Sequence, residues 1–174
     1  MHETLLSSHY IHRGRIVTLR EDTVQLSSGA IAKREIVEHH RAVVVLPVLD
    51  NGDVVLVRQY RIATGRVLLE VPAGLMEIDE APIAAAHREL GEETGFVASE
   101  MQPLFEGFPT PGFCNEYMYF FLARGLTAGV PHPDADEIVE TVTMSVSAVI
   151  AAIQTQEIVD LKTIAAMGWY RGAM

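Results

Sequence analysis

The sequence predicts an α/β fold, an α/β/α sandwich with a mixed sheet, preceded by an N-terminal antiparallel β segment. Three observations indicate this class. Strand-like segments dominate residues 1–70, an amphipathic helix follows, and further strands are succeeded by helices near the C-terminus. The 174 residues are 49% hydrophobic and 21% charged, enough to bury a sizeable core. We therefore expect a β arm at residues 1–40 and one globular domain at residues 41–174.

The arm is expected to consist of strands, because its apolar runs are bounded by turn residues. These runs cover residues 10–20, 23–26 and 32–38, and the Ser27-Ser28-Gly29 turn precedes the last. The arm has no evident hydrophobic core of its own.

The strands of the globular domain begin with a predicted hairpin. Two Val- and Leu-rich runs at residues 42–49 and 54–60 flank Asp50-Asn51-Gly52-Asp53, which is a strong turn signal. Further strands are expected at residues 66–71, 117–123 and 138–144.

The helix with the clearest boundaries covers residues 81–94. Pro82 stands at its start and Gly95 just past its end. Its apolar stripe is expected to consist of Ile83, His87 (or Ala86) and Leu90, with the acidic side chains lying off that stripe. Two more helices are expected at residues 147–155 and 161–170.

The composition excludes several classes of function. A net charge of −10 argues against nucleic acid as the main partner, because binding to a phosphate backbone relies on clustered Lys and Arg. The single cysteine, Cys114, excludes an internal disulfide. No apolar run has the length of a membrane span or follows a basic signal-peptide start. We expect a cytoplasmic protein without a membrane partner.

The predicted helix at residues 81–94 carries an acidic cluster that calls for an explanation. Glu89, Glu92 and Glu93 lie three and four residues apart, where like charges repel, and Arg88 is placed to brace Glu92. A solvated acidic face is the commoner origin of such a run, but it would be expected to include Lys, and residues 81–94 contain none. Clustered carboxylates on a rigid element are typical of a site for a hard divalent cation such as Mg²⁺.

The spacing of these residues resembles the Nudix box, G-x5-E-x7-R-E-U-x-E-E-x-G-U, where U is aliphatic or aromatic. Gly74, Glu80, Arg88-Glu89-Leu90, Glu92-Glu93 and Gly95-Phe96 occupy every defined position. The resemblance implies a Nudix-type α/β/α sandwich with the catalytic domain at residues 41–174. It also implies hydrolysis of a nucleoside diphosphate linked to another group, with Mg²⁺ or Mn²⁺ held by the box glutamates. Metal binding would relieve the repulsion within the cluster.

Two flanking segments resemble the ADP-ribose pyrophosphatase branch of that superfamily. Residues 66–74 are similar to its E-[IV]-P-A-G lead-in, and residues 109–116 to its S-P-G-[FY]-x-x-E loop, with Pro111 fifteen residues after Phe96. Thr110 replaces the more common Ser of that loop. The resemblance implies hydrolysis of ADP-ribose to AMP and ribose 5-phosphate.

The metal and catalytic residues follow from the cluster and the resemblance together. Glu89 and Glu93 are the first candidates for metal ligands, followed by Glu77, with Glu92 and Arg88 as further catalytic residues. The resemblance adds the carbonyl of Ala73, two or three ions per site, and a base on a loop after the box. That base is expected at Glu137, with Asp136, Glu140 and the box itself as alternatives.

Candidate substrate-binding residues lie on both sides of the box. Arg61 is a candidate phosphate contact, as is Arg58, which fits a surface charge equally well. Glu80 is a further candidate substrate contact, and its alternative roles are to orient the helix or to ligate the metal through water. The loop and arm resemblances contribute Gly112, Phe113, Glu116, Arg34 and Glu35. In that branch the arm covers the partner subunit, so a homodimer is expected. The alternative is an arm folded back on its own domain.

Alternative functions remain at this point. Other substrates within the superfamily are another nucleoside diphosphate sugar or dinucleotide, such as GDP-mannose or FAD, whereas RNA-cap and diadenosine polyphosphate hydrolases fit the Pro111 loop less well. A non-catalytic ADP-ribose sensor is the alternative outside enzymes. Such a sensor would be expected to have lost box glutamates, and all of them are present.

Overall fold

The computed structural model describes residues 2–132 and 138–173, and this part of the chain divides into two compact units. The first unit consists of Met1–Arg41 and Gly107–Tyr117. The second consists of Ala42–Glu106 and Met118–Met174. The arm expected at residues 1–40 lies in the first unit, together with the Pro111 loop.

The first unit is an antiparallel sheet of three strands in the order β1-β2-β3. These strands are β1 (Glu3–Arg13), β2 (Val17–Leu26) and β3 (Ile31–His39). The single strand predicted at residues 10–20 is wrong, because the chain turns between β1 and β2, where the N–H of Gly14 donates to the carbonyl of Val17 at 2.9 Å. A lone glycine between two arginines was too weak a turn signal.

The Pro111 loop pairs with β3 within the first unit. The N–H of Val37 donates to the carbonyl of Phe113 at 2.8 Å, and the N–H of Asn115 donates to the carbonyl of Val37 at 3.1 Å. The side-chain oxygen of Asn115 accepts from the N–H of His39 at 2.8 Å. These bonds fix the backbone of the loop that carries Gly112, Phe113 and Glu116.

The second unit contains two sheets, in the orders β10-β5-β6 and β7-β4-β9-β8. The second sheet is mixed, since β4 is antiparallel to β7 and parallel to β9. Its strands are β4 (Ala42–Pro47), β7 (Ala73–Leu75), β8 (Phe96–Gly107) and β9 (Met118–Ala128), and those of the other sheet are β5 (Val54–Arg61), β6 (Arg66–Glu70) and β10 (Val139–Met144).

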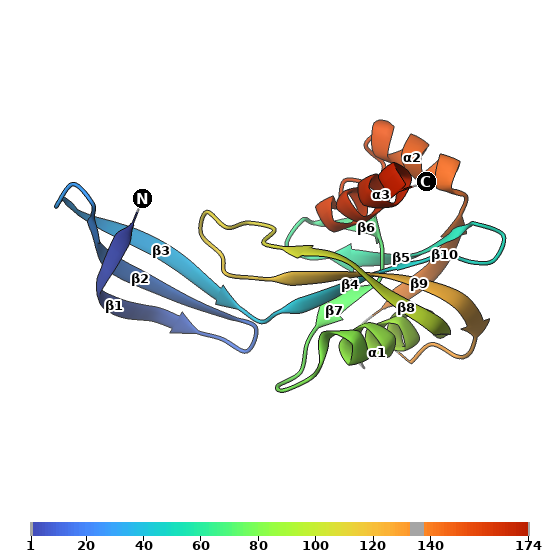
Figure 1. Ribbon diagram of the computed structural model, residues 1–174, viewed down its shortest axis with the longest axis horizontal. Helices are drawn as coiled ribbons and strands as arrows, with labels where there is room; N and C mark the ends of the chain where they lie inside the picture. Colours follow the sequence, from blue (N-terminus) through green and yellow to red (C-terminus); the bar gives the residue numbers. More distant parts are fainter. Residues whose placement is uncertain (1, 133–137, 174) are drawn as a thin grey trace. The chain divides into compact units, whose positions relative to one another are not determined.

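Helices cover both faces of these strands (Figure 1). They are α1 (Pro82–Thr94), α2 (Val146–Gln154) and α3 (Leu161–Ala173). The side chains of β4 alternate between the two resulting cores. Val44 and Leu46 pack in the cluster that includes α2 and α3, whereas Val43 and Val45 pack in the cluster that includes α1. The predicted α/β/α sandwich with a mixed sheet and an N-terminal antiparallel segment is confirmed.

Two further features of the second unit differ from the expectations. The hairpin is wrong: the turn forms, but only the bridge between Val48 and Val54 joins β4 to β5. Both edges of β4 are already paired, with β7 and β9.

Strand β8 was not predicted, because its burial pattern does not alternate. No helix of the described residues is long and apolar enough to cross a membrane.

The buried face of α1 also differs from the predicted stripe. Ile83 and His87 are exposed, whereas Ala86 and Leu90 are buried. Glu89 and Glu93 lie on the buried face, with 9% and 4% of their surface exposed. The carboxylates are therefore held inside the protein, and a solvated acidic face is wrong for these two residues.

Candidate active site

The backbone that enters the box is fixed against the central strand β4. Ala73 and Gly74 pair with Val44 and Val43, and the carbonyl of Pro72 accepts from the N–H of Val45 at 2.9 Å. These bonds place β7 next to the buried face of α1.

The helix α1 has the boundaries that its sequence predicts. Ala81 is the N-cap residue in extended conformation, and Pro82 occupies the first turn, where its missing N–H is of no consequence. At the other end Gly95 adopts φ 74°, and its N–H donates to the carbonyl of Gly91 at 2.9 Å. Both ends of the helix that carries the acidic cluster are therefore defined.

Two contacts join the carboxylates of α1 to β7. The Oε2 of Glu93 accepts from the N–H of Ala73 at 3.0 Å. The carboxylate of Glu89 lies so close to Gly74 that a Cβ built on this glycine would overlap it. Gly74 is needed for this reason, rather than for its backbone freedom.

Arg88 joins the pre-helix loop to the acidic cluster. Its Nε and Nη2 donate to the two oxygens of Glu80, both at 2.9 Å, and Nη2 also donates to the carbonyl of Leu75 at 2.9 Å. Its Nη1 donates to Glu89 at 2.8 Å and to Glu92 at 2.9 Å. The hydrogen bonds to Glu80, above all, raise the pKa of Arg88 despite its partial burial. The guanidinium thus relieves part of the repulsion among these carboxylates.

Glu80 closes the loop that precedes α1. Besides its two bonds to Arg88, its Oε2 accepts from the N–H of Glu77 at 2.9 Å. The hydrogen bonds from Arg88 lower the pKa of Glu80 below its ordinary value, so the carboxylate stays ionised. Glu80 therefore orients Arg88 and the loop, and the side chain of Glu77 is exposed.

The donor set of the box fits a hard divalent cation in its chemistry. Carboxylates and a backbone carbonyl are the oxygen ligands that Mg²⁺ prefers, and Glu89 and Glu93 are held against the backbone at Ala73 and Gly74. Within the described part of the chain, however, no three acidic, His or Cys side chains are already gathered as a metal centre. Two of the three glutamates, Glu89 and Glu92, meet instead at one nitrogen of the protein, Nη1 of Arg88.

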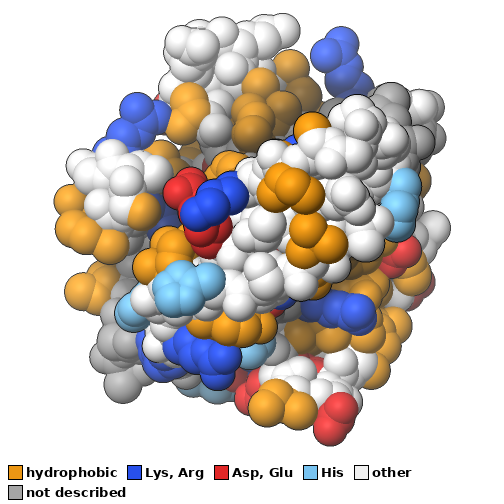
Figure 2. Space-filling view, turned by 90° about the vertical axis from the view of Figure 1, so that its left-hand side faces the viewer, with side chains coloured by type: hydrophobic (Ala, Val, Ile, Leu, Met, Phe, Trp, Pro, Cys, Tyr) orange, Lys and Arg blue, Asp and Glu red, His pale blue; other side chains and the backbone are white. Residues whose placement is uncertain are grey.

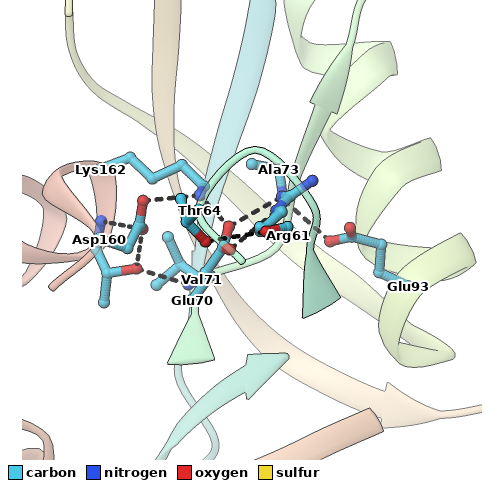
Figure 3. A network of polar contacts seen from close by, with 9 residues as sticks. Arg61, Thr64, Glu70, Val71, Ala73, Glu93, Asp160 and Lys162 are labelled. Carbon is cyan, nitrogen blue, oxygen red and sulfur yellow. Dashed lines mark hydrogen bonds and ion pairs between the residues drawn. The ribbon is translucent and has the colours of Figure 1, made fainter. Parts of the chain in front are cut away.

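A second polar network lies beside the box (Figure 3). Glu70, at the end of β6, has 1% of its surface exposed and binds two cations. Arg61 donates to it through Nε at 3.0 Å and Nη2 at 2.9 Å, and the ammonium of Lys162 donates to its Oε2. Burial alone would raise the pKa of Glu70, but Arg61 and Lys162 outweigh burial and lower it. Arg61 is thus held side-on by a buried carboxylate.

The remaining candidate residues are distributed between the two units. In the first unit, Nη2 of Arg34 binds Oε1 of Glu3 at 2.6 Å, and Glu35 is exposed. Oε1 of Glu116, in the same unit, lies 3.6 Å from Nδ1 of His39. Gly112 and Phe113 lie in the same unit, and 54% of the surface of Phe113 is exposed.

The expected base cannot be placed. Glu137 and its rival Asp136 lie outside the described residues. The other rival, Glu140, lies on β10 and binds Arg58 at 2.9 Å on the surface. Arg58 is therefore a surface charge paired across the sheet.

The sequence interpretation missed four members of the network in Figure 3. Glu70 stands in the lead-in motif, and Asp160, Lys162 and Thr163, which hydrogen bonds join to that segment, lie about 90 residues further along the chain. Thr163 accepts from the N–H of Val71 at 2.8 Å, so α3 is joined to the segment ahead of the box. Only the lead-in glutamate carried a signal in the sequence.

Several known proteins are similar to this chain. Residues 38–166 match the NUDIX domain, and residues 3–37 match the nucleoside diphosphate sugar hydrolase N-terminal domain. The ADP-ribose pyrophosphatase of Bacillus subtilis (strain 168) is 34% identical over 94% of this chain and 89% of its own length. The ADP-ribose pyrophosphatase of Mycobacterium tuberculosis (strain ATCC 25618 / H37Rv) is 43% identical over 75% of this chain and 66% of its own length.

Other relatives carry different names. The GDP-mannose pyrophosphatase of Citrobacter koseri (strain ATCC BAA-895 / CDC 4225-83 / SGSC4696) is 34% identical over 76% of this chain and 74% of its own length. A crystal structure of an "ADP compounds hydrolase" matches the fold with a TM-score of 0.89, over 99% of this chain and 94% of that chain, at 23% identity. The predicted family is confirmed: the chain belongs to the Nudix family.

Proposed function

We propose that this protein hydrolyses the pyrophosphate bond of ADP-ribose, with Mg²⁺ or Mn²⁺, to give AMP and ribose 5-phosphate. The observation that carries this proposal is the intact acidic cluster on α1, with Glu89 and Glu93 held against the backbone at Gly74 and Ala73. Two relatives named ADP-ribose pyrophosphatase, together with the matching N-terminal domain, support the substrate.

The residues of the box have distinct tasks in this proposal. Glu89, Glu93 and the carbonyl of Ala73 would hold the cations, with Glu77 and Glu92 as further ligands and two or three ions per site. A divalent cation held there would supply charge compensation for the phosphates and would make a water more acidic. Arg88 bridges Glu89 and Glu92 through its Nη1 and joins both to Glu80 in the loop before the helix.

Proton removal from the attacking water requires a carboxylate within hydrogen-bond reach. We keep Glu137 in this role. Its rivals Glu140 and Glu92 are each bound by an arginine, Arg58 and Arg88, and would have to leave that partner before accepting a proton. The Glu137→Gln variant should lose about 10²- to 10⁴-fold in kcat, the usual effect of removing a general base. A loss below about tenfold, with a far larger loss in Glu140→Gln, would assign the role elsewhere.

The first unit supplies the candidate contacts to the rest of the substrate. A surface hollow of about 350 Å³ is lined by Arg20, Ile36, Phe108, Pro111 and Phe113, among others. Exposed aromatic rings suit a nucleobase, because they offer stacking area on one side and remain accessible on the other. We propose that Phe113 and its neighbours Gly112 and Glu116, with Arg34 and Glu35 on β3, contact the substrate.

We propose that the protein is a homodimer. Every residue of β1 is exposed, including Leu5, Leu6 and Ile11, and such apolar side chains suit contact with another chain. The face shown in Figure 2 carries hydrophobic side chains scattered among charged and His side chains. Light scattering at micromolar protein should give twice the chain mass of 19.1 kDa. A monomeric mass would contradict this proposal and favour an arm folded back on its own domain.

We place the dimer in the cytoplasm, in keeping with a family that acts on nucleotides.

The second candidate function is hydrolysis of GDP-mannose, which the similarity to a GDP-mannose pyrophosphatase favours. The test is to measure kcat/KM with Mg²⁺ for ADP-ribose, GDP-mannose, FAD, NADH and diadenosine compounds. ADP-ribose is expected to have the highest value. A higher value for GDP-mannose would replace the proposed substrate, and binding of ADP-ribose without hydrolysis of any compound would indicate a sensor.

A further inference from the structure

The start of α3 is bonded to the segment that leads into the box. Asp160 caps the helix, because its Oδ2 accepts from the N–H of Thr163 at 3.0 Å and from the hydroxyl of Thr163 at 2.6 Å. The Thr163 oxygen then accepts from the N–H of Val71, two residues before Ala73. Lys162, which lies between Asp160 and Thr163 in the chain, donates a hydrogen bond to the carboxylate of Glu70.

The network contains four charges with a sum of zero. Lys162 bridges two carboxylates, Glu70 and, at 2.9 Å, the Oδ1 of Asp160. Glu70 in turn is shared between Lys162 and Arg61. The Lys162 and Glu70 side chains are 12% and 1% exposed, so solvent screens this interaction only weakly.

Arg61 is the member of this network that faces the box. It uses Nε and Nη2 to bind Glu70, while Nη1 has no hydrogen-bond partner among the described residues. The hydrogen bonds to Glu70, and after them the charges of Glu70, Glu93 and Asp160, raise its pKa. In the view of Figure 3, Arg61 lies between Glu70 and the box residue Glu93, so its charge acts on both.

We propose that Lys162 is a positioning residue for substrate binding, which keeps the charge of Arg61 available to the pyrophosphate by compensating Glu70. The inference rests on the proposed function, since it concerns the same site. Without Lys162, Arg61 would stand alone against Glu70 and Asp160, and the network would carry a net charge of −1. An anionic substrate would then approach a neutralised arginine, next to an acidic cluster.

Two single substitutions separate this role from mere structural support. Lys162→Met and Asp160→Asn both break the ion pair between Lys162 and Asp160, but they change the charge of the network in opposite directions. Asn is about as good an N-cap as Asp, so Asp160→Asn preserves the start of α3. If the ion pair serves only stability, both variants should change KM in the same direction.

The expected results follow from the charge. Lys162→Met should raise KM about tenfold and change kcat less than about threefold, because a phosphate contact present in both ground state and transition state affects KM alone. Asp160→Asn should leave KM unchanged or lower it, and Lys162→Arg, which keeps the charge, should stay within about threefold of the wild type. Arg171→Met, which removes an exposed cation from the last turn of the same helix, is the matched control and should change neither constant.

The inference and the proposed function can fail separately. An active wild type with an unchanged KM in Lys162→Met would overturn the inference alone. If the wild type hydrolyses none of the compounds, the proposed function fails. Calorimetry with ADP in the absence of metal still tests the role of Lys162, because Lys162→Met should bind ADP about tenfold more weakly than the wild type. Should Lys162→Met not fold, a tenfold higher KM in Asp160→Asn would overturn the inference, and an unchanged or lower KM would support it.

Discussion

The position of the box carboxylates depends on the smallest residue of the motif as well as on the charged ones. Gly74 lies directly against the carboxylate of Glu89, and Arg88 binds Glu89, Glu92 and Glu80. The sequence identified every one of these residues through their spacing. It did not show that Glu89 and Glu93 are buried, because that depends on which face of α1 meets β7.

Gly74→Ala should therefore disrupt the site, since the new methyl group must displace Glu89 from its place beside the backbone. We expect a loss of at least about 1–3 kcal/mol of unfolding free energy, as for other overpacked positions, and a large loss of turnover. Gly91→Ala on the same helix is the matched control, because a Cβ there meets no atom within 4 Å. Alanine in mid-helix should stabilise by about 0.5–1 kcal/mol. Urea unfolding and steady-state kinetics of both variants would test this, and equal behaviour would contradict it.

Glu93→Gln and Glu89→Gln should each lower turnover by orders of magnitude, because neutral amides bind Mg²⁺ poorly. The fold should survive, since the glutamine oxygen of Glu93→Gln can still accept from the N–H of Ala73. Thermal unfolding should therefore show a cooperative transition in both variants. Near-normal activity of either variant at limiting Mg²⁺ would show that the ligand assignment is wrong.

Glu70 predicts a dependence of stability on pH. Despite its burial, Arg61 and Lys162 lower its pKa from the ordinary 4.5, so the folded protein takes up this proton less readily than the unfolded chain. Its contribution is thus present above about pH 4.5 and is lost as the pH falls through the folded-state pKa. The stability difference between wild type and Glu70→Gln should shrink between pH 6 and pH 3, as measured by urea unfolding. A constant difference would contradict the assigned pKa shift.

At the scale of elements, helices were predicted better than strands. The boundaries of α1 were predicted because Pro82 and Gly95 are local signals. The hairpin of residues 42–60 was not found, because the partners of β4 are set by long-range pairing with β7 and β9. A local turn signal at Asp50–Asp53 specifies that the chain reverses, but it does not specify whether the two strands share a ladder.

The end of α1 offers a test at this scale. Gly95 combines φ +74° with a close contact, because a Cβ there would lie 2.6 Å from the backbone nitrogen of Pro131. Gly52 has φ +86° but open space around it. Gly52→Ala should cost about 1–2 kcal/mol for the left-handed backbone alone, and Gly95→Ala should cost clearly more. Urea unfolding measures both values, and a similar loss in the two variants would show that the contact with Pro131 is unimportant.

At the scale of the whole molecule, the predicted site residues fall into two groups. The box and Arg61 belong to the second unit, whereas Arg34, Glu35 and the Pro111 loop belong to the first. Motif spacing could identify members of both groups, because they lie in short segments that are each continuous in sequence. It could not identify the contribution of α3, since Lys162 and Glu70 are 92 residues apart and only the folded chain brings them together.

In the proposed function, the acidic cluster on α1 makes this protein a metal-dependent pyrophosphatase of ADP-ribose. The most direct measurement is phosphorus NMR of millimolar ADP-ribose incubated with the wild-type protein and Mg²⁺, with Glu93→Gln in parallel. We predict equal amounts of AMP and ribose 5-phosphate from the wild type, no product when the metal is chelated, and almost none from the variant. Absence of AMP from the wild type with both Mg²⁺ and Mn²⁺, or release of AMP by Glu93→Gln at the wild-type rate, would disprove the proposed activity.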